Sequence, residues 1–258
     1  MIKLVYVIKR RPDLSPEAFY DYWLNKHGPL VKSKSKDLRI VRYVQSHLID
    51  HPANEAMRSL RGMLEPVDGI TEVWWNSLED MQAAYATAEG QAAGAVLAED
   101  EAKFIDFSGS QVFMTNEHLI FDHTDGKGPG PEAVKVTYLL SRKAGMSQEA
   151  CHRTWLVDHG PLVASFAGVS GMTKYVQSHT TAPEQNEAAR ASKNYLPPLD
   201  GITEVWLGSL DQLAPAAGTP ESAKAALAMA EDERRFVEMG ASRCFLTKEH
   251  LIFDHAPA

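Results

Sequence analysis

The sequence of 258 residues has little of what marks several specialised classes of protein. Its two cysteines, Cys151 and Cys244, are too few for a disulfide framework, and we expect both to be buried thiols that pack as small apolar side chains. Positive charge is in the minority, with 26 Lys and Arg against 34 Asp and Glu, a formal net charge of −8. This excess of negative charge argues against a nucleic acid as partner.

Long hydrophobic runs and nucleotide-binding loops are also absent from the sequence. The apolar stretch in MIKLVYVIKRRPD (residues 1–13) is too short for a secretory signal or a membrane span, and its alternation is typical of a strand. There is no glycine-rich phosphate loop, no GxSxG motif and no CxxC pair. We therefore expect a cytoplasmic location, no membrane partner, no metal and no cofactor.

The dominant feature of the sequence is a tandem repeat, in which the step from His27 to His159 is 132 positions. Four motifs share this offset: WLNKHGPLV (23–31) and WLVDHGPLV (155–163), RYVQSH (42–47) and KYVQSH (174–179), DGITEVW (68–74 and 200–206), and EHLIFDH (117–123 and 249–255). One constant offset predicts a duplicated small domain. We place the copies at 1–123 and 134–258, joined by the Gly/Pro-rich linker TDGKGPGPEA at 124–133.

Each copy predicts the order strand, helix, strand, strand, helix, strand. In the first copy the strands are expected at 3–10, 38–47, 69–75 and 110–123, the helices at 15–28 and 77–106, and a polar loop at 50–59. The first helix should begin after Ser15 as N-cap and end at Gly28-Pro29. This order is that of the ferredoxin-like βαββαβ unit, an α+β fold.

A four-stranded sheet of this kind carries helices on one face only, so its other face needs a cover. We expect the sheet of the second copy to provide it, which would form a closed barrel and an internal pseudo-dimer within one chain. The EHLIFDH extensions should then reach across to the partner copy. A further homodimer of the whole chain is compatible with this arrangement.

Eight of the ten histidines form pairs at the repeat offset, and His27 with His159 is the first pair of interest. Phe19, Trp23 and His27 have the i, i+4, i+8 spacing of one helix face, as do Cys151, Trp155 and His159 in the second copy. Two interpretations stay open. The imidazolium caps the last carbonyls of the helix, or the imidazole lines a pocket between helix and sheet and transfers a proton.

Two strand motifs add further polar candidates on alternating positions. The YVQSH row comprises Tyr43, Gln45, His47 and their counterparts Tyr175, Gln177, His179, and it either lines a pocket or makes structural hydrogen bonds. The GITEVW row comprises Glu72, Trp74 and their counterparts Glu204, Trp206. Two interpretations of its glutamates stay open. They orient a histidine or act as acid and base, or they are strand carboxylates that face solvent or form ion pairs.

With these motifs, each copy resembles the EthD family, named from a protein of ethyl tert-butyl ether degradation and part of the dimeric α/β-barrel superfamily. Members are usually single domains that dimerise, so this chain looks like two of them fused. The resemblance implies a cavity between helix and sheet in each half, with the histidine of the HGP motif at His27 and His159. Relatives on the fold include cofactor-free monooxygenases, polyketide cyclases, dehydratases, decarboxylases and muconolactone isomerase, and haem enzymes use the wider fold.

The resulting expectation is a cofactor-independent enzyme, either a lyase, isomerase or dehydratase or an oxygenase, that acts on a small apolar aromatic or polyketide-like catabolic intermediate. The expected catalytic residues are His27, His159, His47 and His179. The expected substrate-binding residues are Trp23, Tyr43, Gln45, Glu72, Trp74, Trp155, Tyr175, Gln177, Glu204 and Trp206. The alternatives are a non-catalytic small-molecule binding protein and a haem-dependent enzyme.

Overall fold

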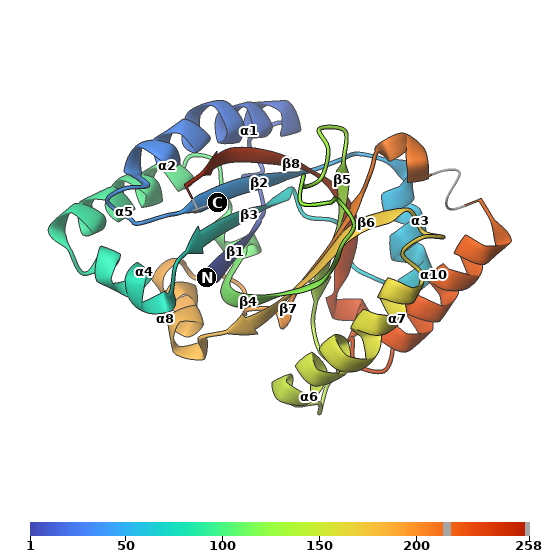
Figure 1. Ribbon diagram of the computed structural model, residues 1–258. Coiled ribbons are helices and arrows are strands. Elements are labelled where there is room, and N and C mark those ends of the chain that lie inside the picture. Colours follow the sequence, from blue (N-terminus) through green and yellow to red (C-terminus); the bar gives the residue numbers. More distant parts are fainter. Residues whose placement is uncertain (214–217, 256–258) are drawn as a thin grey trace.

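The two copies share one closed antiparallel barrel, seen in a computed structural model that describes residues 1–213 and 218–255. The strand order around the barrel is β1-β3-β2-β8-β5-β7-β6-β4, and β4 closes the ring by pairing with β1. Helices lie outside the barrel at both ends of the view in Figure 1. The α+β fold of two tandem ferredoxin-like units in an intramolecular barrel is confirmed.

The first copy contains the elements β1 (Ile2–Ile8), α1 (Pro16–Tyr22), a π-helical turn (Trp23–His27), α2 (Gly28–Lys34), β2 (Arg42–Leu48), α3 (Pro52–Arg61), β3 (Gly69–Trp75), α4 (Leu78–Tyr85), α5 (Ala88–Glu101) and β4 (Gln111–Asp122). The second contains β5 (Val134–Leu140), α6 (Gln148–Arg153), a π-helical turn (Thr154–His159), α7 (Gly160–Ser165), β6 (Met172–Thr181), α8 (Pro183–Lys193), β7 (Gly201–Leu207), α10 (Pro220–Glu233) and β8 (Arg243–Asp254). Turns and bends fill the stretch between β4 and β5. The copy boundaries given above stay a prediction.

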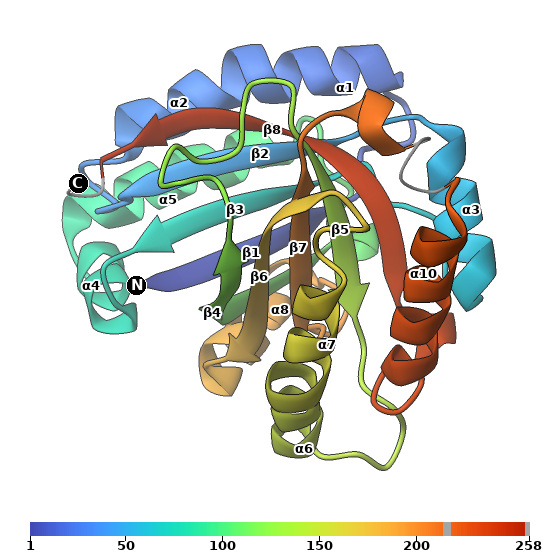
Figure 2. The same cartoon turned by 45° about the vertical axis from the view of Figure 1, so that its right-hand side comes forward.

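The last strand of each copy crosses to the other copy, as predicted. Strand β4 pairs with β6 of the second copy, with Asn116 opposite His179, and β8 pairs with β2 of the first copy, with Gln45 opposite His250. These two exchanges join the half-barrels, so neither sheet has a free edge where the halves meet. Figure 2 shows β8 running beside β2 along the upper side of the barrel.

The predicted polar loop at 50–59 is wrong, because this stretch forms helix α3. His51 caps the helix by accepting a hydrogen bond from the Ala53 amide, Pro52 occupies its first turn, and Gly62 ends it in the left-handed conformation (φ 74°). Helices α3 and its counterpart α8 each lie against the opposite half: α3 packs on β8, and α8 packs on β4. In both views α3 stands beside α10 (Figures 1 and 2).

The predicted helix end at Gly28-Pro29 is also wrong, because the chain continues through it as α2. A π-helical turn precedes the proline, and the Gly28 amide bonds back to the Trp23 carbonyl. This shifted hydrogen-bond register accommodates a proline, which has no amide to contribute. His27 is therefore in the middle of a continuous helical stretch, and the interpretation that it caps a helix terminus falls away. The second copy repeats the turn at Thr154–His159.

The interior of the barrel has an apolar zone and a charged zone, the latter formed by Lys3, Lys135, Glu72 and Glu204. The apolar zone consists of Val5, Val7, Val67, Ile70, Phe113, Leu139, Leu199, Ile202 and Phe245. Helices of both copies cover the outer face of the barrel, and α3 and α8 do so on a strand of the opposite copy. Within the described parts of the chain, no helix is long and apolar enough to cross a membrane.

Candidate functional site

Each copy has a cavity between the outer face of its sheet and its helices. The first has a volume of about 630 Å³ and the second about 230 Å³. Ligand pockets in proteins usually range from about 300 to 1,000 Å³, so only the first lies within that range. The walls of both are mainly aliphatic and aromatic, and His27 lines the first cavity while His159 lines the second.

Each of these histidines is held by an aspartate from the long helix of its own copy. His27 Nδ1 donates to Asp100 Oδ2 at 2.9 Å, and His159 Nδ1 donates to Asp232 Oδ2 at the same distance. Both imidazoles are 5% exposed. With Nδ1 engaged, Nε2 is the nitrogen that remains for a ligand, so the aspartate selects the tautomer in which Nε2 is a base.

Further hydrogen bonds keep the Asp100 carboxylate charged. Tyr22 donates to it at 2.6 Å and Lys103 at 3.1 Å. Burial on its own raises the pKa of Asp100, but the hydrogen bonds from Tyr22, His27 and Lys103 outweigh burial and hold that pKa below its ordinary value. An ionised aspartate stabilises an imidazolium beside it, which is what a histidine needs in order to accept a proton.

The YVQSH row supports the helix that carries His27. In the π-helical turn the Trp23 carbonyl accepts from the Gly28 amide, and Gln45 Nε2 also donates to that carbonyl at 2.8 Å. Gln45 Nε2 also donates to the Tyr43 hydroxyl at 3.1 Å, and Trp23 Nε1 donates to the same hydroxyl at 3.3 Å. Tyr43 lines the cavity, whereas Gln45 and Trp23 lie behind it. Gln177, Tyr175 and Trp155 repeat these contacts, but there both Tyr175 and Trp155 line the cavity.

The Tyr43 phenol is a neutral hydrogen-bond donor at physiological pH. Burial raises its pKa to about 12, although hydrogen bonds from Gln45, Trp23 and Thr71 oppose that rise. Burial raises the pKa of Tyr175 as well. Each cavity thus combines an aspartate-held imidazole with a protonated phenol.

The structure does not bring His47 or His179 to the cavities. His47 is stacked on Trp23, with ring centroids 4.5 Å apart, and its Nε2 donates to Gln45 Oε1 at 3.1 Å. Burial, and next the proximity of His250, lower the pKa of His47 to about 3. His179 is likewise stacked on Trp155, and burial, and next the proximity of His152, lower its pKa to about 3. Both rings are neutral near pH 7, which leaves them poorly suited to proton transfer at that pH.

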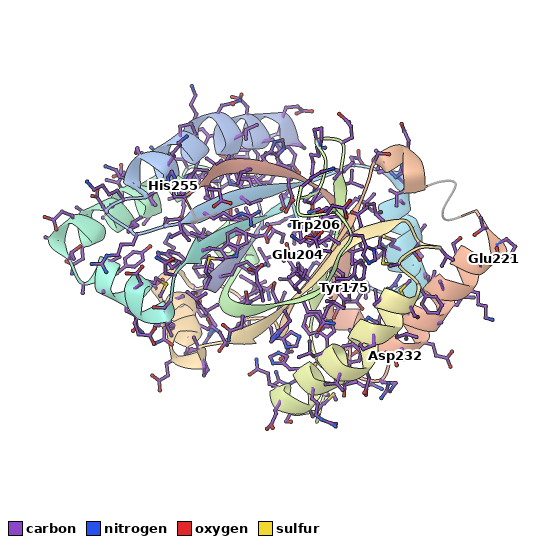
Figure 3. The ribbon with its side chains drawn as sticks, viewed as in Figure 1. Tyr175, Glu204, Trp206, Glu221, Asp232 and His255 are labelled. Atoms are coloured by element: carbon purple, nitrogen blue, oxygen red, sulfur yellow. The ribbon has the colours of Figure 1, made fainter. Side chains whose placement is uncertain are left out.

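The GITEVW glutamates lie inside the barrel rather than at either cavity. Glu72 and Glu204 are 1% and 2% exposed and share two fully buried lysines. Lys3 Nζ lies 3.2 Å from Glu72 and 2.5 Å from Glu204, while Lys135 Nζ lies 2.6 Å and 2.7 Å from them. Of the two interpretations left open, ion pairing is the one observed, and Figure 3 places Glu204 near the centre of the molecule.

Trp74 and Trp206 pack against the lysines of the same charged zone. Trp74 Nε1 donates to Glu117 at 2.8 Å and Trp206 Nε1 donates to Glu249 at 2.7 Å. Neither indole lines a cavity among the described residues. The oxygens of Glu72, Glu204 and Glu249 lie within 4.8 Å of one another, a spacing that a metal ion could bridge. The Lys135 ammonium contacts all three, so the carboxylates already have their counter-ion.

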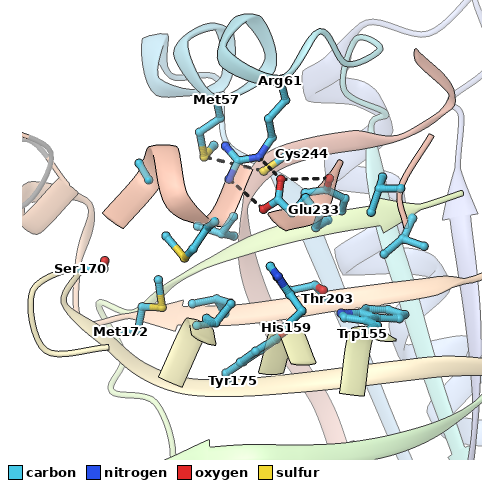
Figure 4. A pocket seen from close by; sticks show the side chains of 18 of the residues that line it. Met57, Arg61, Trp155, His159, Ser170, Met172, Tyr175, Thr203, Glu233 and Cys244 are labelled. Atoms are coloured by element: carbon cyan, nitrogen blue, oxygen red, sulfur yellow. Dashed lines mark hydrogen bonds and ion pairs between the residues drawn. The ribbon is translucent and has the colours of Figure 1, made fainter. Parts of the chain in front are cut away.

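Sequence reasoning missed an ion pair in each cavity, whose cationic member comes from the opposite copy. Lys193 of α8 contacts Glu101 in the first cavity at 2.5 Å. Its counterpart Arg61 of α3 contacts Glu233 in the second cavity at 2.7 Å and 3.0 Å, as Figure 4 shows. The signal was present in the sequence, since AEDE occurs at 98–101 and again at 230–233, at the repeat offset. The aspartate of this motif bonds the histidine of its own copy, and the final glutamate pairs with the lysine or arginine from the other copy.

Comparisons with known proteins agree with this architecture. The family model described as the EthD domain matches residues 11–108 and 143–240. Similar solved structures include an anthrone oxidase-like protein, 15% identical, with 100% of this chain and 95% of that one covered and a TM-score of 0.54. A protein proposed to be a monooxygenase from Lactobacillus acidophilus NCFM is 10% identical, with 97% and 94% covered and a TM-score of 0.50. At these identities the likeness shows the fold alone.

A search of curated proteins gave no match. The family model, however, covers well over half of the chain, in two segments that each contain the HGP histidine and the aspartate that holds it. The chain therefore belongs to the EthD domain family, with two copies of the domain in tandem.

Proposed function

We propose that the protein is a cofactor-independent enzyme that transfers a proton on a small apolar aromatic or polyketide-like compound. The observation that carries this proposal is the His27–Asp100 pair at the wall of a mainly apolar cavity of about 630 Å³. A buried imidazole whose second nitrogen is held by a carboxylate is the arrangement of a general base.

The reaction begins with a carbon acid or phenol seated in the cavity. Nε2 of His27 takes a proton from the ligand, and the electron pair of the broken bond moves onto a ligand oxygen as an enolate or phenolate. Asp100 stabilises the imidazolium that forms, and the Tyr43 hydroxyl is a donor for the developing oxyanion. Return of the proton to another atom gives an isomerase, loss of a leaving group gives a lyase or dehydratase, and reaction of the carbanion with dioxygen gives an oxygenase.

The lining of the cavity supports a flat aromatic ligand. Its wall includes the rings of Tyr6, Tyr43, Trp75, Tyr85 and Tyr195, set among aliphatic side chains. Aromatic walls bind planar rings through apolar burial and ring contacts. One structural neighbour is an anthrone oxidase-like protein, and anthrone belongs to the same class of compound. Anthrone has an acidic CH₂ group whose carbanion is delocalised onto a ketone oxygen.

Deuterium exchange into anthrone tests the proposal without knowledge of the complete reaction. Proton NMR in D₂O under nitrogen would follow loss of the CH₂ signal with wild type, with His27→Gln and with the matched His159→Gln. General-base catalysis contributes about 10²- to 10⁴-fold, so His27→Gln should slow enzyme-dependent exchange by at least about 100-fold. Exchange that survives His27→Gln unchanged would remove the assignment. Binding of anthrone without any exchange would favour a binding protein.

A haem-dependent enzyme is a second candidate, favoured by the same pair of residues. A histidine whose Nδ1 donates to a carboxylate is oriented as an iron ligand often is, and the first cavity is large and mainly apolar. Haem, if bound there, would supply oxidative chemistry and His27 would be its ligand. Addition of haem should then produce a Soret band that His27→Gln abolishes, and no band would exclude this candidate.

A further inference from the structure

The two acidic residues that end the long helix of each copy hold groups from different halves of the chain. In the first copy Asp100 holds His27 of the same copy, and the adjacent Glu101 holds Lys193, which α8 brings from the second copy. Both His27 and Lys193 line the cavity of about 630 Å³. The cavity therefore has a proton-transfer group and, near it along α5, an ammonium–carboxylate pair that exists only because the halves are joined.

The equivalent pair in the second cavity is of a different kind. Arg61 uses Nε and a terminal nitrogen to contact both oxygens of Glu233, and the two side chains are 10% and 7% exposed. Such a two-point contact between planar groups engages both oxygens of the carboxylate. The Tyr138 hydroxyl lies a further 3.4 Å from Glu233, which closes the cluster. In Figure 4 this cluster faces His159 across a cavity of about 230 Å³.

The pair in the first cavity is more open. Lys193 contacts Glu101 through one carboxylate oxygen, and their side chains are 23% and 18% exposed. The Lys193 ammonium also lies 4.5 Å from the centroid of the Phe107 ring. An ammonium has three donors and a carboxylate has several acceptor positions, so a single hydrogen bond between them leaves capacity on both groups. Two further tyrosines of the cavity wall, Tyr6 and Tyr195, are hydrogen-bonded to each other at 2.9 Å. Burial, and next the charge of Glu101, raise the pKa of both.

We propose that the Lys193–Glu101 pair binds the ring hydroxyl of a hydroxylated aromatic ligand, and that this ligand enters the first cavity and not the second. The hydroxyl accepts a hydrogen bond from Lys193 and donates one to Glu101, so it satisfies both free capacities at once. The aromatic wall holds the rings, and the carbon acid faces His27. The substrate class is then a hydroxylated aromatic or polyketide-derived compound, and the second repeat acts in the first cavity by supplying Lys193.

This inference rests on the proposed function only in sharing its cavity. A dye that ionises tests the hydroxyl-binding pair without requiring any reaction at His27. The probe is 2-hydroxyanthraquinone, a three-ring compound whose phenol changes the absorption spectrum when it loses its proton. Spectra of the bound dye across a pH series give its apparent pKa on wild type, Lys193→Met, Glu101→Gln and Lys193→Arg. Arg61→Lys in the second cavity is the matched control.

The two variants should move the bound phenol in opposite directions. Lys193→Met leaves the carboxylate alone beside the hydroxyl and should raise the dye pKa, lowering the ratio of phenolate to phenol by about tenfold or more. Glu101→Gln leaves the ammonium alone and should raise that ratio by a similar factor. Lys193→Arg keeps the charge and should resemble wild type, and Arg61→Lys should leave the spectrum unchanged.

Several results would overturn the inference. One is a dye that does not bind the wild type, and another is a pair of variants that shift the dye pKa in the same direction or not at all. A spectrum that responds to Arg61→Lys would move the ligand to the second cavity. Anthrone carries no ring hydroxyl, so its exchange does not depend on this pair. If the enzyme exchanges anthrone but the dye pKa does not respond to Lys193→Met, only this inference fails. If the dye pKa responds as expected but anthrone is not exchanged, only the assignment of His27 as general base fails.

Discussion

A substitution at Glu72 tests the buried charges at the centre of the barrel. Glu72 is 1% exposed and shares Lys3 and Lys135 with Glu204. Burial, and next the charge of Glu204, raise the pKa of Glu72 from 4.5 to about 7, while Lys135 and Lys3 oppose them. The charges of Lys135 and Lys3 outweigh burial at Glu204 and lower its pKa well below 4.5. The two carboxylates therefore titrate far apart.

The sign and size of the pH effect follow from this raised pKa. The folded protein holds the Glu72 proton more tightly than the unfolded chain does, so the stabilisation is complete below pH 4.5 and is lost as the pH rises through about 7. A difference of roughly 2.5 pKa units corresponds to about 3 kcal/mol. Of this, about 2 to 3 kcal/mol should be lost between pH 5 and pH 8.

The variant Glu72→Gln mimics the protonated side chain and cannot titrate. Urea unfolding at pH 5 and at pH 8 gives the free energy of unfolding for wild type and variant. We expect the variant to gain about 2 to 3 kcal/mol relative to wild type on going from pH 5 to pH 8, whatever its stability at pH 5. Arg58→Met, at an exposed ion pair, should show no such gain. A difference for Glu72→Gln that is the same at both pH values would refute the reasoning.

Two further predictions concern stability. Gly69→Ala should destabilise the protein by about 1 to 3 kcal/mol in urea unfolding, because an added Cβ would lie 2.7 Å from both the Ser46 carbonyl oxygen and the Trp23 ring; an unchanged midpoint would contradict this. His47 and His179 have pKa values lowered to about 3, so their stabilisation is complete above pH 6.5 and is lost as the pH falls towards 3. Glu72 has the opposite effect, and after it is subtracted the free energy of unfolding should be about 2 kcal/mol lower at pH 5 than at pH 6.5. A protein that is more stable at pH 5 would contradict the lowered pKa values of the two histidines.

Most of the fold could be predicted from the sequence because the repeat supplied an internal comparison. The constant offset fixed two equal units, and alternation along the strands showed which residues share a face. The exchange of β4 and β8 followed from the need to cover a sheet face and edge. Helix α3 was missed because its residues are mainly polar, so the caps at His51 and Gly62 were the only strong sign of it.

The site was predicted only in part, for physical reasons that differ between residues. The helix face pointed to His27, but its partner Asp100 is 73 positions away, and only the repeated AEDE at 98–101 and 230–233, which the motif comparison passed over, marked it. The π-helical turn depends on hydrogen-bond register, which side-chain pattern does not encode. Glu72 was assigned to substrate because alternation along a strand shows which residues share a face, but not which face meets a cavity and which the barrel interior.

The central claim is that His27 is a base whose function depends on Asp100. The most direct measurement is the rate of deuterium exchange into anthrone by wild type and by Asp100→Asn, with Asp232→Asn as the matched change in the second cavity. Asparagine keeps the volume but can bond the imidazole in the wrong tautomer. The account predicts exchange slower by about 100-fold or more for Asp100→Asn and close to wild type for Asp232→Asn. Equal rates for wild type and Asp100→Asn would contradict it.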